Sequence, residues 1–174
     1  MEVHKGKSRI AFVGKHFTCK IPNPNTLRQL SDIQEYVKQR DLKGLYKWFQ
    51  YTENGFRWAI SGVLQNWQEF KLSKELNGIV VPTRLSVFGI FNIQDTATDL
   101  PKNISNHILF VELGRAIGYD IMKDTHTFRN SDNFGIHNGQ AKIRDYGDPK
   151  IGSILKDHFS KIKESLRSLI SKPK

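Results

Sequence analysis

The dipeptide Asn138-Gly139 is the sequence feature that most restricts how this chain can fold. Both residue types tolerate a positive φ, which the tight type I′ turn of a two-residue β-hairpin requires. The residues on either side of it, from Phe134 to Tyr146, are therefore predicted to form an antiparallel hairpin. The chain must then combine sheet structure with the helices that its other segments indicate.

Hydrophobic periodicity and turn residues predict the remaining elements. The predicted strands are Arg9 to Val13, His16 to Ile21 after a Gly14-Lys15 turn, Ile79 to Pro82, and Leu85 to Ile93. The predicted helices are 26–39, 60–76, 107–118 and 151–170, and residues 124–133 are expected to be polar and irregular. This order predicts an α+β protein of two lobes, a strand-rich lobe over 1–98 and a lobe with a polar loop, hairpin and basic helix over 99–174.

The length and composition exclude several classes of protein. A chain of 174 residues has the size of one domain, or of two small lobes sharing a cleft. No apolar run has the length of a bilayer span, and Met1 to Lys5 lack the apolar core of a signal peptide. The single cysteine, Cys19, cannot form an internal disulfide or a multi-cysteine metal site. We therefore expect a soluble, cytoplasmic protein without a membrane partner.

The chain is strongly basic, with 27 Lys and Arg against 17 Asp and Glu, which gives a net charge of +10. The last 25 residues hold seven basic and two acidic side chains, so half of the excess lies there. Such a charge favours an anionic partner, which could be a nucleotide, nucleic acid or an acidic protein surface. A solvated basic surface without a partner is the alternative.

The segment from Asp124 to Gly147 carries the most chemistry. A polar loop ends at Asn133, the hairpin follows, and Asp145-Tyr146-Gly147 comes twelve residues after Asn133. This arrangement resembles the protein-kinase-like superfamily, and most closely the small, divergent kinase-like proteins of bacteriophages. The resemblance implies ATP and Mg²⁺ as cofactors, with Asn133 and Asp145 as the metal ligands. A phage protein of this kind would act in the cytoplasm of the host.

The same resemblance implies a catalytic base for the acceptor hydroxyl. Removing residues 127–130 leaves Asp-Thr-His-Ser-Asp-Asn-Phe-Gly, which matches an Asp-x-His-x-x-Asn loop. Asp124 is therefore the expected base, with a four-residue insertion behind it. Asp132 is the alternative.

The first half of the chain supplies the remaining parts of the resemblance. Phe17-Thr18-Cys19-Lys20 is similar to the kinase strand that ends in a phosphate-binding lysine, and Glu69 is similar to the helix glutamate that orients it. Asp95, Thr96 and Ala97 would lie near the adenine. Two departures are a helical and aromatic insertion over about 26–60 and the absence of a Gly-x-Gly-x-x-Gly loop at Gly6 or Gly14.

These observations predict a kinase-like protein that binds ATP and Mg²⁺ in a cleft between its lobes, as a phosphotransferase or as an inactive pseudokinase. The alternative is a non-enzymatic basic protein that engages a host protein or nucleic acid. The aromatic residues from Tyr46 to Trp67 are expected in the core, although they could also stack on bases. A zinc site at His126 and His137 lacks a close ligand spacing.

Overall fold

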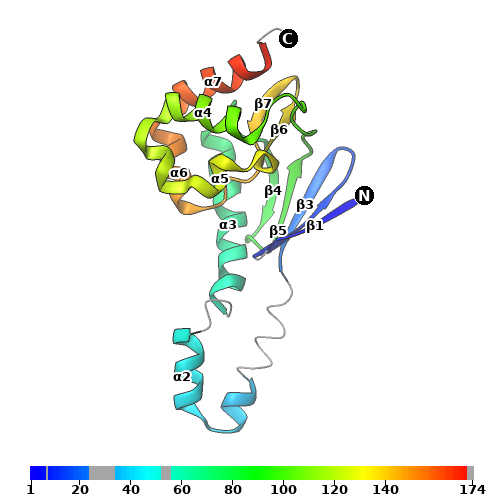
Figure 1. Ribbon diagram of the computed structural model, residues 1–174. Helices are drawn as coiled ribbons and strands as arrows, with labels where there is room; N and C mark the ends of the chain where they lie inside the picture. The colour runs from blue at the N-terminus through cyan, green and yellow to red at the C-terminus, as the bar shows by residue number, and fades with distance from the viewer. Residues whose placement is uncertain (7, 24–33, 52–55, 172–174) are drawn as a thin grey trace.

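The computed structural model describes residues 1–6, 8–23, 34–51 and 56–171 (Figure 1). It is an α+β fold with a five-stranded antiparallel sheet in the order β1-β2-β3-β5-β4 and a separate two-stranded sheet, β6-β7. The strands are β1 (Glu2–Lys5), β2 (Arg9–Val13), β3 (Phe17–Pro22), β4 (Thr83–Val87), β5 (Phe91–Asp95), β6 (Phe134–His137) and β7 (Gln140–Ile143). The α-helices are α2 (Leu42–Tyr51), α3 (Phe56–Glu75), α4 (Asn106–Ile117), α5 (Thr125–Arg129), α6 (Pro149–Asp157) and α7 (Phe159–Ser171). Two 3₁₀ helices are η1 (Gly118–Asp124) and η2 (Ser131–Asn133).

The large sheet has two different faces because side chains alternate along each strand. In β3, Thr18 and Lys20 are buried, and they lie opposite Gln94 and Asn92 of β5, which are buried too. The long helix α3 runs along this face (Figure 1). Phe17, which precedes Thr18, is exposed on the other face. The register of β3 therefore points Lys20 toward α3.

The apolar core lies at the other end of the molecule, where α4, α6 and α7 gather around the β6-β7 hairpin and the last turns of α3 (Figure 1). Its fully buried members include Leu72, Leu109, Phe134, Ile143, Leu155 and Ile162. Helix α2 lies apart from this core and from the sheet (Figure 1). Among the helices of the described residues, none is long and apolar enough to cross a bilayer.

The predicted β6-β7 hairpin is confirmed. Asn138 and Gly139 have φ values of 51° and 73°, as a type I′ turn requires. Backbone hydrogen bonds join β7 to the segment after α3, from Val81 N to Ile143 O at 2.9 Å and from Ile143 N to Ile79 O at 2.9 Å. The hairpin is thereby attached to the same segment that leads into β4.

Several predicted elements differ in detail. β1 is an additional strand, residues 79–82 precede β4 instead of forming a strand, and the predicted strand 85–93 covers the end of β4, the turn after it and the start of β5. The predicted single C-terminal helix is divided at His158, where φ is −115° and ψ is 18°. There the imidazole of His158 lies 2.9 Å from Asp120 of η1, which ties the break to the preceding segment. The predicted helix 26–39 is helical at 34–38, and its earlier residues fall largely outside the described part.

Candidate functional site

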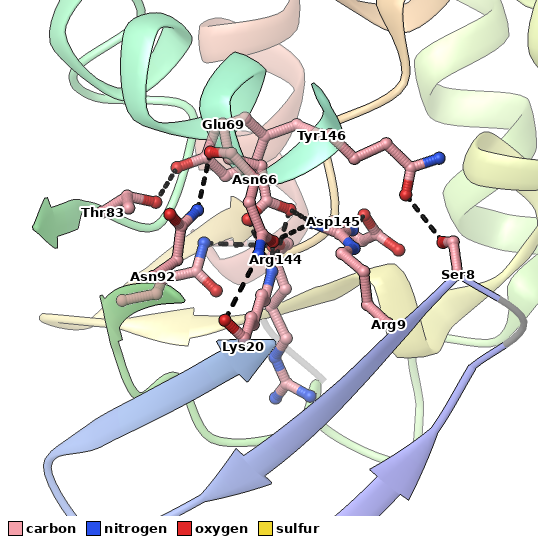
Figure 2. Close-up of polar contacts among 12 residues, drawn as sticks. Ser8, Arg9, Lys20, Asn66, Glu69, Thr83, Asn92, Arg144, Asp145 and Tyr146 are labelled. Carbon is pink, nitrogen blue, oxygen red and sulfur yellow. Dashed lines mark hydrogen bonds and ion pairs between the residues drawn. The ribbon is translucent and has the colours of Figure 1, made fainter. Parts of the chain in front are cut away.

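Lys20 of β3 and Glu69 of α3 meet in the interior between the sheet and the helix (Figure 2). The Lys20 ammonium donates to both carboxylate oxygens of Glu69, at 2.9 and 3.0 Å. It also donates to the backbone oxygen of Arg144 at 2.9 Å. The side chain of Lys20 is 9% exposed and that of Glu69 is fully buried. The two residues that the resemblance to kinase-like proteins implied as a pair are therefore in contact, and both lie beside the strand end that leads to Asp145.

The buried face of α3 is unusually polar. Asn66 and Glu69 are both fully buried, one turn apart on the helix. The Asn66 amide donates to the backbone oxygen of Gly89 at 2.9 Å, and its own backbone oxygen accepts from Asn92 at 2.7 Å. These bonds fix the rotation of α3 against β5 and so direct Glu69 toward Lys20.

Arg9 is a member of the site that the sequence analysis did not single out. It begins β2, two residues before Ala11, and Ala11 pairs with Lys20, so Arg9 and Lys20 face the same side. Its guanidinium donates to Glu69 at 2.9 Å and to Asn66 at 3.2 Å, and it forms a short contact with Asp145. Its side chain is 10% exposed. The sequence indicates this position of Arg9 only through its spacing of two residues from Ala11 in the predicted hairpin.

Asp145 and Asn133 lie at the open ends of the β6-β7 hairpin. The backbone N–H of Arg144 donates to the backbone oxygen of Asn133 at 2.7 Å, which places Asn133 next to the residue before Asp145. The Asn133 amide donates to Thr127 O at 3.2 Å, and this bond orients its amide group. The Asp145 side chain is 52% exposed although one of its oxygens contacts Arg9. It is the member of the cluster that solvent reaches most easily.

Tyr146 and Gly147 hold the turn that carries Asp145. Tyr146 is fully buried, and its hydroxyl donates to Val81 O at 2.7 Å and lies 3.0 Å from the hydroxyl of Thr83. Gly147 lies so close to α3 that a Cβ atom there would be 2.6 Å from the backbone oxygen of Gln65. The turn is thus clamped between the start of β4 and the helix that carries Glu69.

The charges of the four ionisable groups balance, with Arg9 and Lys20 against Glu69 and Asp145. Burial by itself would lower the pKa of Arg9, but the carboxylates of Glu69 and Asp145 outweigh it and hold that pKa above its usual value. Desolvation would raise the pKa of Asp145, but the charges of Arg9 and Lys20 keep it below the usual range. Burial lowers the pKa of Lys20, and Glu69 opposes this effect. Asp145 is therefore ionised at neutral pH and can accept a cation.

Arg144 crosses the end of the hairpin. A Cβ atom at Gly135 would lie 2.1 Å from its Nε, so the side chain packs directly over that glycine. Nη1 donates to Asp99 at 2.9 Å, while Nε and Nη2 are buried and have no partner among the described residues. An unpaired buried donor costs about 1–3 kcal/mol, so an acceptor brought by a ligand would be favoured here.

Asp95 and Thr96 are arranged differently from the predicted adenine contacts. The Asp95 side chain lies on the face of the sheet opposite Lys20, where it accepts two hydrogen bonds from Arg84 at 2.9 and 2.7 Å. The backbone N–H groups of Asp95 and Thr96 donate to Pro82 O at 2.8 Å and His16 O at 3.0 Å. These donors are committed to the fold and are not available to a base.

The two candidates for the catalytic base are placed unequally. Asp124 ends η1, and its side chain lies outside the described part of the chain. Asp132 is exposed in η2, and its backbone N–H donates to the Asn130 side chain at 3.1 Å. Both remain predictions for this role.

Asp145 and Asn133 carry oxygen groups of the kind that a hard divalent cation takes as ligands, a carboxylate near an accessible surface and a side-chain amide. Such an ion would take its other ligands from water and phosphate. In the described residues, no group of three or more His, Cys, Asp or Glu side chains forms a protein-only metal cage. Arg9 would compete with the ion for Asp145.

Comparison of the chain with protein-family models, with curated proteins and with solved structures finds no match.

Proposed function

We propose that this protein is a reduced, two-lobed kinase-like protein that binds ATP with Mg²⁺ beside Lys20 and Asp145 and transfers the terminal phosphoryl group to a hydroxyl acceptor. The observation that supports this proposal most is the buried Lys20–Glu69 pair, which lies against the strand end that leads to Asp145. A lysine held by a glutamate near an acidic residue is suited to binding phosphates, because the carboxylate orients the ammonium. All three N–H groups of Lys20 donate to Glu69 and to Arg144 O in this state, so a phosphate must displace one of these bonds.

Each residue of the site then has a role. Lys20 contacts the phosphates, Glu69 orients it, and the unpaired N–H groups of Arg144 donate to the oxygens of a ligand at the end of the hairpin. Asn133 and Asp145 would hold Mg²⁺, which neutralises charge on the phosphate oxygens when it is bound. Asp124 would accept the proton of the acceptor hydroxyl, and Asp132 is the alternative base.

Arg9 supports a second candidate function, a pseudokinase-like protein that binds its partners without turnover. Its guanidinium already neutralises Asp145, and the N–H groups of Asp95 and Thr96 are committed to backbone partners. The contact between Arg9 and Asp145 must break before Asp145 can bind a metal ion strongly. If that contact persists, the protein interacts with its partners mainly through its basic surface.

The test is thermal stabilisation by ATP, measured with and without Mg²⁺. The kinase-like proposal predicts a rise in melting temperature with ATP and Mg²⁺, and a loss of the Mg²⁺-dependent part of that rise in Asp145→Asn. Asp157→Asn changes an exposed carboxylate on α6 and serves as the matched control. Arg9→Gln is expected to increase the dependence on Mg²⁺, because the competing cation is gone. Absence of any shift in the wild type and in Arg9→Gln would refute nucleotide binding.

Turnover separates the two candidates. In an assay of phosphate transfer or release from ATP, replacing the true base by Asn is expected to lower the rate about 10²-fold or more. Comparing Asp124→Asn with Asp132→Asn identifies which residue acts. Nucleotide binding without any turnover would favour the pseudokinase-like protein.

A further inference from the structure

The face of the large sheet opposite Lys20 carries a groove of about 920 Å³. Its walls are β3, β5 and β4, the β2-β3 turn at Lys15 and His16, and the turn of the β6-β7 hairpin. Two backbone hydrogen bonds between Thr98 and Ile136, at 3.0 and 2.8 Å, hold the hairpin against this end of the sheet. The volume is in the usual range for small-molecule sites, which is about 300–1,000 Å³.

The floor of the groove is an ordered polar cluster. A register shift in β4 between Thr83 and Leu85 allows Arg84 to reach Asp95, and the guanidinium binds both carboxylate oxygens. The His137 ring is 3.1 Å from the same carboxylate, through Nε2. Asp95 and His137 are 8% and 9% exposed. Asp95 is thus satisfied from two sides and leaves no free negative charge for a ligand to meet.

The groove has a net positive charge even when the charge of Asp95 is subtracted. Lys15 and Arg84 contribute two positive charges against the single charge of Asp95, and the buried Lys142 on β7 lies close enough to influence both Asp95 and His137. The other nitrogen of His137, Nδ1, is buried without a partner among the described residues. A buried polar atom left unpaired favours a ligand that can bond to it.

The remaining wall is apolar and exposed. Phe17 is 57% exposed and Leu85 45% exposed, beside Ile93 and Ile136. An exposed phenyl ring at the mouth of a basic groove offers a stacking surface for a flat ring, while the cations beside it attract a negative group.

We propose that this groove binds a small aromatic phosphate, with its phosphate at Lys15 and Arg84 and its ring on Phe17 and Leu85. The site is separate from the Lys20–Glu69 cluster, since strand alternation places the two on opposite faces of the sheet. It does not depend on the kinase-like function.

Phenyl phosphate is the probe, titrated by calorimetry or by NMR, with inorganic phosphate and phenol as the two partial ligands. Phenyl phosphate is expected to bind roughly tenfold more tightly than either of them, because it uses both halves of the groove. Phe17→Ala and Lys15→Ala are each expected to weaken it roughly threefold to tenfold. Both residues are exposed, and circular dichroism checks that the variants remain folded.

The controls test the location. Phe88→Ala removes an 80% exposed phenyl ring from the β4-β5 turn outside the groove, and Lys102→Ala removes an exposed lysine elsewhere, so neither should change the affinity. Asp145→Asn should leave phenyl phosphate binding unchanged. The proposal is overturned if phenyl phosphate does not bind, if Phe88→Ala weakens it as much as Phe17→Ala, or if Asp145→Asn abolishes binding that Phe17→Ala retains.

Discussion

Glu69 holds two cations at once, and this makes it the most sensitive residue of the site. Lys20 and Arg9 both bond to its carboxylate at 2.9 Å, and its side chain has no contact with solvent. Pairs of this kind contribute little net stability by themselves, but removing one partner leaves a buried charge without compensation. The same residue that would orient a phosphate-binding lysine therefore also joins α3 to two strands.

Glu69→Gln is expected to lower the free energy of unfolding by about 3–5 kcal/mol, because both cations lose their counter-charge in a buried site. The measurement is urea-induced unfolding. Glu75→Gln is the matched variant on the same helix, where the carboxylate is 51% exposed and pairs with Lys156 on the surface. That change should cost no more than about 1 kcal/mol. Equal losses in the two variants would contradict the assigned role of Glu69.

His137 gives the stability a predictable pH dependence. Burial lowers its pKa below the usual value, with Lys142 adding to the effect and Asp95 opposing it. The histidine pKa of the unfolded chain is about 6.5, so below that pH the unfolded chain binds a proton that the folded chain does not. Stability is full above that pH and falls as the pH decreases from about 6.5 through the lower, folded-state pKa.

Replacement of His137 by Gln is expected to reduce this acid-induced loss, which is at most about 1.4 kcal/mol per pH unit for one proton. Denaturant unfolding at several pH values between 7 and 5 measures it. His16→Gln, at an exposed histidine, should keep the pH dependence of the wild type. A His137→Gln variant with an unchanged pH slope would argue against the buried neutral ring.

Helix α3 shows why the sequence predicted the position of a helix in the chain but not which of its faces is buried. The periodicity of its apolar residues predicts that Trp67 faces inward, but Trp67 is 38% exposed. The buried face instead carries Asn66, Glu69 and Ser73, with Leu72 beside them. A hydrophobic pattern cannot identify a buried face composed of polar residues, because their burial depends on partners from distant strands.

The close approach of α3 to the Asp-Tyr-Gly turn explains the glycine at 147. Gly147→Ala would bring a Cβ atom to 2.6 Å from the Gln65 backbone oxygen, and a backbone atom cannot move aside as a flexible side chain can. The expected loss is about 1–3 kcal/mol, together with weaker Mg²⁺-dependent stabilisation by ATP because Asp145 shifts. Thermal unfolding with and without ATP and Mg²⁺ measures both effects.

Gly114 provides the opposite case within the same protein. It lies inside α4, where the nearest atom to an added Cβ is 3.7 Å away, so Gly114→Ala should stabilise the protein by about 0.5–1 kcal/mol. If Gly147→Ala also stabilised, the clamp between the turn and α3 would be disproved.

For the whole molecule, the dominant property is its charge of +10, half of which comes from the last 25 residues. Lys161 and Arg167 of α7 are exposed, whereas Ile162 and Leu166 between them are buried in the core. The helix thus presents its charges to solvent and its apolar residues to the protein. This surface is the basis of the alternative function, an interaction with nucleic acid or with an acidic protein.

If nucleic acid binds through α7, the logarithm of the affinity for duplex DNA should fall linearly with the logarithm of the salt concentration, by about 0.9 for each phosphate contact. The double variant Lys161→Ala, Arg167→Ala should then reduce that slope by about 1.8. Removing two exposed lysines elsewhere, Lys5 and Lys102, should change it less. Fluorescence anisotropy across a salt series measures the slope, and equal effects of the two double variants would exclude α7 as a specific binding surface.

Local signals in the sequence were sufficient for the α+β class, the hairpin at Asn138-Gly139 and the helices α3 and α4, because turn geometry and hydrophobic spacing act over a few residues. The meeting of Lys20 with Glu69 was expected from the resemblance to kinase-like proteins and not from a local pattern, since 49 positions separate the two residues. Only the tertiary structure revealed four other features: the contact of Arg9 with Glu69, the polar buried face of α3, the position of Asp95 on the face opposite Lys20, and the groove on that face. Those features depend on strand register and on contacts between segments 50 to 140 residues apart, for which no local pattern exists.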